Sequence, residues 1–390
     1  MTAALSGPSV GFPIRWFTLA LALALTLGGC PTGSPEPGDD DTTEDEEPFH
    51  PPDEAGPHAA ATVEDTAPSR EGLTLPVQLW YPAHQPDDDD HVYDDLIEGA
   101  AADGGEPDCS EPRPVLVFSH GNSGIRYQTW SVMEFLATHG WLVVAPDHVD
   151  NTFLDFDMDL WPRIAMRRPW DVADAFDWLV ARSEDEDDAL AGCVDPAAGY
   201  AVMGHSFGGY TTYATSGASI DMELMAATCE ADPVEGCDAV DQWQDDHPGE
   251  RFADHSDARI WAAVPWAPAW HEVFGGTMTE ITVPTLVIGG DRDTLTPWIG
   301  AVEASYRELA VVPRYLAGLE DAGHYSFTDF CDLLPPNGNN GCGEDFRPYE
   351  EVLGTTRTLS LAFLLATRGV DEARSYLPPA VGMWVWEAEE

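Results

Sequence analysis

The stretch Tyr200–Gly209, with the sequence YAVMGHSFGG, constrains the fold of this chain more than any other segment. A short apolar run leads into Gly-x-Ser-x-Gly around Ser206, which is the pattern of a buried strand that turns sharply into a helix. In such a turn the serine backbone is strained, and flanking glycines let neighbouring chain pass close by. The first N–H groups of the helix point at whatever the serine hydroxyl attacks. We therefore interpret Ser206 as a nucleophile.

A histidine with the right context follows late in the chain. The run Arg314–Ala317 is typical of a short strand, and the loop after it contains His324 directly behind a glycine. This placement makes His324 the candidate general base for Ser206. The remaining histidines that we considered are expected to orient loops, to pack locally or to lie at the surface: His120, His148, His205 and His271.

Three carboxylates are candidates for the third member of a triad. The apolar run Val283–Gly290 ends in an acidic loop that holds Asp291 and Asp293, and Asp321 lies in the later loop beside the histidine. The order serine, acid, histidine, each on a loop after a strand, is the order that α/β-hydrolases use. The sequence therefore predicts a serine hydrolase, which needs no metal or organic cofactor.

The loop after the apolar run Pro114–Ser119 has the sequence HGNSG. Attack on an ester creates an oxyanion, which needs two N–H donors that are already in place. One is expected from Phe207, the residue after the nucleophile, and the other from Asn122 in this loop. We predict that these two backbone groups form an oxyanion hole.

Strand-like and helix-like segments alternate along the chain, which predicts an α/β fold with a mostly parallel central sheet flanked by helices. The site is expected at the carboxyl ends of the strands. The predicted helices are Trp130–His139, Pro169–Arg182 and Tyr349–Thr367, and the predicted strands are Val77–Tyr81, Pro114–Ser119, Trp141–Ala145, Ile260–Val264 and those around Ser206, Asp293 and His324.

The N-terminus has the features of a targeting segment. Arg15 precedes the apolar run Trp16–Leu27, which ends at Cys30 and resembles a bacterial lipoprotein signal over residues 1–30. The expected location is therefore the outer membrane or cell surface through a lipidated Cys30, with an ordinary secretory signal as the alternative. Residues 31–70 are rich in Pro, Asp and Glu and predict a disordered tether, followed by a hydrolase domain over 71–390.

The charge of the chain is extreme, with a net value of −53 at pH 7 and 17 basic residues that are all arginine. Such a field repels polyanions, so nucleic acid is excluded as a partner and an anionic membrane surface is disfavoured. We expect a monomer that takes a small-molecule or lipid ester. This acidity is explained in general terms by surface solubility. A more specific hypothesis is adaptation to a saline habitat.

Besides Cys30 the chain contains six cysteines, and an even number in an exported protein favours disulfides over a zinc site. Their spacing fits no zinc knuckle. Proximity along the chain suggests three pairs: Cys229–Cys237, Cys331–Cys342 and, by remainder, Cys109–Cys193.

Residues from about 72 to 367 resemble the dienelactone-hydrolase-related branch of α/β-hydrolases. The motifs Phe118–Gly121 and Gly204–Gly209 are similar to those of platelet-activating-factor acetylhydrolases. By contrast, Ala262–Trp270 and Asp291–Pro297 look more like cutinase-like polyester hydrolases. Pro265 stands where the acetylhydrolases carry their acid, so the chain departs from that family there.

The resemblance to polyester hydrolases implies two further roles. It selects Asp293 as the acid, because this residue directly precedes the turn that ends at Pro297. It also implies that Trp270 lines the acyl-binding cleft. Residues 216–258 are longer than in those enzymes and predict a cap-like insertion over the site, with a surface excursion as the alternative.

The predicted activity is hydrolysis of short- to medium-chain carboxylic esters through an acyl-enzyme. The alternatives are a phospholipid esterase like the acetylhydrolases and, from another class, an inactive binding lipoprotein with this fold.

Overall fold

The computed structural model describes residues 49–333, 340–378 and 382–390 of the chain. The described residues belong to one compact unit that begins at Phe49. The signal predicted over residues 1–30, its Cys30 and the first part of the predicted tether lie outside the described residues. Within the described ranges, no helix is both long and apolar enough to cross a membrane.

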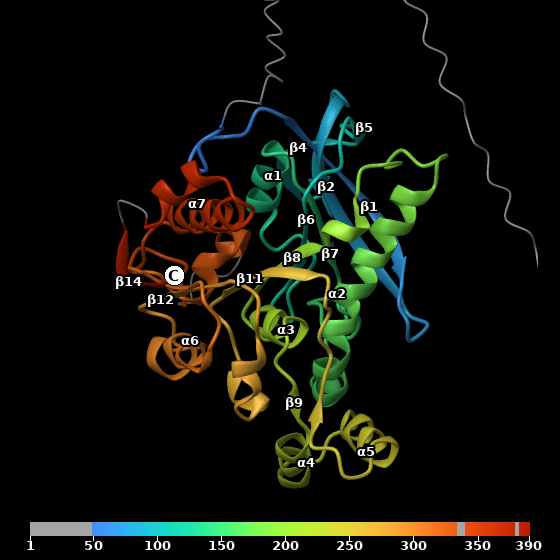
Figure 1. Cartoon of the computed structure of the whole chain (residues 1–390), viewed down its shortest axis with the longest axis vertical. Coiled ribbons are helices and arrows are strands. Elements are labelled where there is room, and N and C mark those ends of the chain that lie inside the picture. Colours follow the sequence, from blue (N-terminus) through green and yellow to red (C-terminus); the bar gives the residue numbers. More distant parts are fainter. Residues whose placement is uncertain (1–48, 334–339, 379–381) are drawn as a thin grey trace, which may run out of the picture. The chain divides into compact units, whose positions relative to one another are not determined.

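One sheet of 12 strands organises the described residues. Its strands are β1 (Ala59–Pro68), β2 (Thr74–Pro86), β3 (Asp90–Tyr93), β4 (Ile97–Asp103), β5 (Gly105–Pro107), β6 (Val115–Ser119), β7 (Leu142–Pro146), β8 (Tyr200–His205), β11 (Ile260–Trp266), β12 (Thr285–Gly290), β13 (Arg314–Leu319) and β14 (Met383–Glu389). They lie in the order β14-β13-β12-β11-β8-β6-β7-β2-β1-β4-β3, with β5 beside β2 (Figure 1). From β7 to β13 the neighbours are parallel, and β2 and β14 pair with this central block antiparallel. All the parallel strands therefore end at the same edge.

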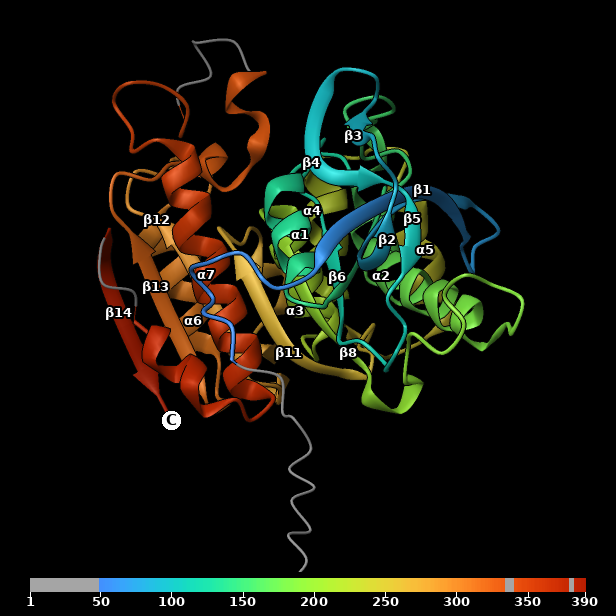
Figure 2. The same cartoon turned by 90° about the horizontal axis from the view of Figure 1, so that it is seen from above.

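Helices cover both faces of the sheet. They are α1 (Trp130–Thr138), α2 (Trp161–Glu184), α3 (Phe207–Thr215), α4 (Met222–Ala231), α5 (Cys237–Asp246), α6 (Glu303–Glu308) and α7 (Tyr349–Thr367). Figure 1 shows α1 and α7 above the central strands and α3 and α6 below them, and Figure 2 gives the view from above. The order and the two layers confirm the predicted mostly parallel α/β architecture.

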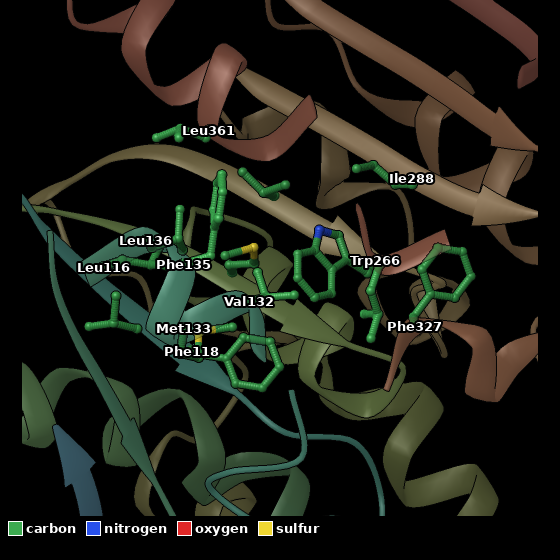
Figure 3. Packing of buried hydrophobic residues seen from close by; sticks show 14 of the residues in the cluster. Leu116, Phe118, Val132, Met133, Phe135, Leu136, Trp266, Ile288, Phe327 and Leu361 are labelled. Atoms are coloured by element: carbon green, nitrogen blue, oxygen red, sulfur yellow. The ribbon is translucent and has the colours of Figure 1, made fainter. Parts of the chain in front are cut away.

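Successive side chains of a strand point to opposite faces of the sheet, so each central strand contributes to the hydrophobic core on both sides. In β6, Leu116 and Phe118 pack with the apolar side chains of α1 and α7, as Figure 3 shows. Val115 and Val117 point to the opposite face and pack with α2. A strand buried on both faces reads as a continuous apolar run, which is why β6 is recognisable in the sequence.

The compact unit begins earlier than the sequence predicted. Residues 31–70 were expected to be a tether, but Ala59–Pro68 forms β1 and pairs antiparallel with β2 over its full length. Ala61, Thr62 and Ala67 are buried there, although the segment is polar and contains few large side chains. Backbone pairing with the apolar strand β2 therefore compensates for a weak local pattern.

The strands at and near the two edges of the sheet were not predicted from the sequence either. Strands β3 to β5 fall in an acidic segment, and β14 lies close to the C-terminus. Asp, Glu and Gly are depleted in strands, so β3 to β5 give little local signal. Acidic side chains on edge strands also discourage pairing with another chain.

Helix α2 differs from the prediction in its start. It was expected to begin at Pro169, but it begins at Trp161, with Pro162 in the first turn and Pro169 inside the helix. A proline has no N–H to donate to the carbonyl four residues earlier. That carbonyl, on Ala165, accepts a hydrogen bond from the Tyr210 hydroxyl at 3.0 Å instead. A tertiary contact thus compensates for the missing backbone bond.

The insertion 216–258 forms α4, α5 and the short two-stranded pair β9 (Ile220–Asp221) and β10 (Phe252–Ala253). It packs beside the start of α2, where Arg163 pairs with Asp238 at 2.7 Å (Figure 1). The predicted disulfides Cys229–Cys237, Cys331–Cys342 and Cys109–Cys193 are all present. The first of them ties α4 to α5 within the insertion.

Candidate active site

Ser206 lies in a sharp turn between the end of β8 and the start of α3. Its backbone has φ 58° and ψ −114°, which is strained for a residue with a side chain. A Cβ on Gly208 would lie 1.8 Å from the carbonyl oxygen of Ser119, and a Cβ on Gly204 would lie 2.3 Å from the oxygen of Gly208. Both glycines are therefore required by close backbone approach, as the motif predicted.

Three side chains meet at the carboxyl edge of the sheet. The Ser206 Oγ lies 2.8 Å from His324 Nε2, and His324 Nδ1 lies 2.7 Å from Asp293 Oδ2. His324 follows β13 and Asp293 follows β12, so neighbouring parallel strands deliver them to one place. The structure brings together the three residues that the sequence analysis selected.

Asp293 is held in a fixed orientation. Its Oδ1 accepts the backbone N–H groups of Leu295 and Thr296, each at 2.8 Å, and its Oδ2 accepts the Thr296 hydroxyl at 2.7 Å. Burial acts to raise the pKa of Asp293, but the hydrogen bonds from His324 and Thr296 outweigh it and hold the pKa below its usual value. The carboxylate is therefore ionised when it faces the imidazole.

The two rival carboxylates are placed elsewhere. Asp321 pairs with Arg292, and Asp291 has a buried oxygen without a partner among the described residues. Neither contacts His324 through a hydrogen bond in the described part of the chain. Of the three candidate carboxylates, Asp293 is the one that contacts the His324 ring.

Gln128 and His205 form a chain of hydrogen bonds that ends at the backbone of His324. The Gln128 amide oxygen accepts the N–H of Gly121 at 3.0 Å, which leaves its amide nitrogen to donate to His205 Nδ1 at 3.2 Å. His205 Nε2–H then donates to the carbonyl of His324 at 3.0 Å. Burial, with the nearby His324, lowers the pKa of His205 to about 3, so it stays neutral as this assignment requires.

The backbone N–H groups of Asn122 and Phe207 flank Ser206 and have no hydrogen-bond partner in the described residues. The Asn122 side chain is oriented by Asn151, whose Nδ2 donates to Asn122 Oδ1 at 2.9 Å. Unpaired N–H groups at a helix start and on the neighbouring loop can receive a negatively charged oxygen. They are the two N–H groups that the sequence predicted for an oxyanion hole.

A pocket of about 630 Å³ opens at Ser206 and His324. Its outer wall is built from large apolar side chains that come from separate loops: Leu96, Phe153, Leu295, Phe330 and Leu333. Several are exposed, Leu96 at 83% and Leu295 at 57%. These residues were not predicted from the sequence, because an isolated apolar side chain in a loop gives no periodic signal.

Two expectations about this pocket were wrong. Trp270 does not line it; its ring packs edge-on against Phe207 with centroids 4.8 Å apart and against Trp161 at 5.3 Å. No residue of 216–258 lines it either, so the insertion is not a cap over this pocket. The direction of these loops depends on tertiary packing, which the local sequence does not specify. Trp270 itself adopts a left-handed backbone with φ 57°.

No group of three or more His, Cys, Asp or Glu residues is arranged to hold a metal ion in the part of the chain that the structure describes.

Comparison with known proteins gives one family. Residues 106–246 match the family model described as Chlorophyllase, a segment that contains the loop after β6 and the turn at Ser206 but ends before Asp293 and His324. No individual curated protein matches the chain significantly. Together with the sheet order, the match confirms the α/β-hydrolase fold and supports an ester hydrolase at the level of reaction class. The narrower resemblance to dienelactone hydrolases, polyester hydrolases and acetylhydrolases stays a prediction.

Proposed function

We propose that this protein is a serine carboxylic-ester hydrolase that forms an acyl-enzyme on Ser206. The observation that carries the proposal is the continuous hydrogen-bonded chain from Ser206 through His324 to Asp293, at the floor of an apolar pocket. The strained serine backbone supports it further, because such strain persists where it serves a function.

In this mechanism His324 Nε2 takes the hydroxyl proton as Ser206 attacks the ester carbonyl. Asp293 holds the proton of the imidazole on Nδ1 and stabilises the imidazolium that forms. The N–H groups of Asn122 and Phe207 donate to the oxyanion of the tetrahedral intermediate. The alcohol leaves with the proton from His324, and a water molecule activated by the same imidazole hydrolyses the acyl-enzyme.

The apolar wall of the pocket supports esters with a short or medium acyl chain as substrates. A cavity of about 630 Å³ accommodates a small molecule rather than a folded partner. None of the described residues that line the pocket is a carboxylate, so a cationic side chain of a substrate has no charged partner among them. These features favour an uncharged ester over a basic peptide.

The test is hydrolysis of p-nitrophenyl esters from acetate to palmitate, with chlorophyll, the ester that names the matched family, as a further substrate. Ser206→Ala should abolish the rate, whereas Ser305→Ala, a buried serine bonded to Tyr213, should leave it unchanged. The chain-length profile then separates a short-acyl esterase from a lipid enzyme. A folded wild type that hydrolyses none of these esters and is not labelled by a fluorophosphonate would instead indicate a binding protein.

A further inference from the structure

Arg168, on α2, is fully buried behind the site. Its guanidinium donates to four acceptors: the Thr211 hydroxyl at 3.0 Å, the Ser119 hydroxyl at 3.1 Å, the carbonyl of His120 and the side-chain oxygen of Asn151. None of the four is a carboxylate. A buried cation without a direct counter-ion is costly, so its presence requires an explanation.

A buried carboxyl group, that of Asp171, is connected to Arg168 through two neutral side chains. Ser119 Oγ lies 2.9 Å from His148 Nε2, and His148 Nδ1 lies 2.8 Å from Asp171 Oδ2. All of these residues are completely buried. Burial raises the pKa of Asp171 to about 8, lowers that of Arg168 to about 9 and lowers that of His148 well below its usual value. Arg168 is thus held inside the protein by a connected network of hydrogen bonds and not by a directly paired carboxylate.

This second array of serine, histidine and aspartate is not a second nucleophilic site. Its Ser119 hydroxyl has no exposure to solvent and is already bonded to Arg168. A substrate carbonyl has no access to it. The role of the array must therefore be sought in what Arg168 holds in place.

Arg168 contacts both segments that provide the unpaired N–H groups of the site. Its guanidinium carbon lies 4.5 Å from the centre of the Phe207 ring, on the residue after the nucleophile. On the other side it binds the carbonyl of His120 and, through Asn151, reaches the side chain of Asn122. One planar group with several fixed donors can connect these parts, which the single nitrogen of a lysine cannot do.

We propose that Arg168 is the positioning residue of the oxyanion hole: it sets the spacing between the N–H of Phe207 and the N–H of Asn122, with Asn151 as the connecting side chain. The inference rests on the proposed function, because only a hydrolase uses these N–H groups to bind an oxyanion. It predicts that Arg168 acts on the transition state without touching substrate, since a donor displaced by about 1 Å already costs about 100-fold in rate.

The experiment compares Arg168→Lys and Asn151→Ala with the wild type in the hydrolysis of p-nitrophenyl butyrate. The matched control is Arg113→Lys, a largely buried arginine paired with Asp108 at the opposite end of β6. We expect both test variants to lower kcat by about 10- to 100-fold with KM within about threefold, because the lost interaction acts in the transition state only. The control should keep the wild-type kcat.

A second readout reports the oxyanion hole directly. An alkyl trifluoromethyl ketone adds to Ser206 and places a negative oxygen where the substrate oxyanion forms, so its affinity should fall in parallel with kcat. Thermal unfolding measures the structural cost of each variant separately. Should Arg168→Lys fail to fold, Asn151→Ala decides the question, because it changes no charge.

Two results would overturn the inference. One is a pair of test variants that unfold at lower temperature but keep the wild-type kcat and ketone affinity, as expected of a purely structural arginine. The other is a rise in KM at unchanged kcat, which would assign Arg168 to substrate binding. A wild type that neither hydrolyses esters nor reacts with a fluorophosphonate refutes the proposed function itself, and the inference falls with it.

Discussion

Replacing Asp293 by asparagine tests the proposed mechanism at its most specific point. The Oδ1 atom accepts two backbone N–H groups, which cannot become acceptors, so the amide oxygen of the new side chain must take this position. The amide nitrogen then faces Thr296 and His324 in place of Oδ2. The Thr296 hydroxyl can turn to accept, but His324 Nδ1 can accept only if its proton moves to Nε2. The imidazole would then have no lone pair for the proton of Ser206.

The loss expected from this tautomer change is about 10⁴-fold in kcat, as for other triads of this type. In free energy it corresponds to about 5 kcal/mol of transition-state stabilisation. The fold should survive, because the hydrogen bonds to the backbone of Leu295 and Thr296 are retained in Asp293→Asn. The loss should therefore appear in kcat and not in the unfolding temperature.

The assay is kcat/KM on p-nitrophenyl butyrate, with the ¹⁵N shifts of the His324 ring as a direct report of the tautomer. Asp291→Asn is the matched control, and its kcat/KM should stay within about threefold of the wild type. The reasoning is refuted if Asp293→Asn keeps its rate within tenfold of the wild type, or if the control loses as much.

The other predictions concern stability, the insertion and the N-terminus. Burial raises the pKa of Asp329 to about 7, so its favourable contribution is complete below about pH 4 and is lost as the pH rises through 7. Asp329→Asn should therefore stabilise the protein at pH 8, by up to about 4 kcal/mol, and the gain should vanish toward pH 4 in thermal melts. Replacing Cys229 and Cys237 by serine should cost about 2–3 kcal/mol of unfolding free energy but leave the ester chain-length profile unchanged, since the insertion does not line the pocket. A changed profile would restore the cap interpretation. Cys30→Ser should abolish incorporation of labelled fatty acid; labelling that persists would place the anchor elsewhere.

The parts of the site that were predictable depend on short-range sterics. The turn at Ser206 needs a glycine at position 208, because the backbone there passes close to the carbonyl of Ser119. This requirement appears in the sequence as the five-residue motif at 204–208. Asp293 and His324 were found because buried strands give continuous apolar runs, and residues directly after such runs meet at one edge of the sheet. The resemblance to known enzymes then separated Asp293 from Asp291.

The parts that were not predictable depend on contacts between distant segments. Strand β1 exists because β2 offers it a partner, and helix α2 continues through Pro169 because Tyr210 satisfies the free carbonyl of Ala165. The direction of Trp270 is set by packing against Phe207 and Trp161. Local composition is ambiguous at each of these points, and tertiary contacts of a few kcal/mol decide the outcome.

The sequence by itself predicted the fold class and the three side chains that meet at the carboxyl edge of the sheet. Ser206 is specified within a turn, His324 lies in the loop after a strand, and the resemblance to known enzymes selected Asp293. Only the tertiary structure decided which loops form the wall of the pocket, that residues 216–258 do not line it, and that Arg168 contacts both His120 and Phe207. The physical reason is that a pocket wall and a buried charge network are made of residues far apart in the chain, whose meeting is encoded by packing and not by any local pattern.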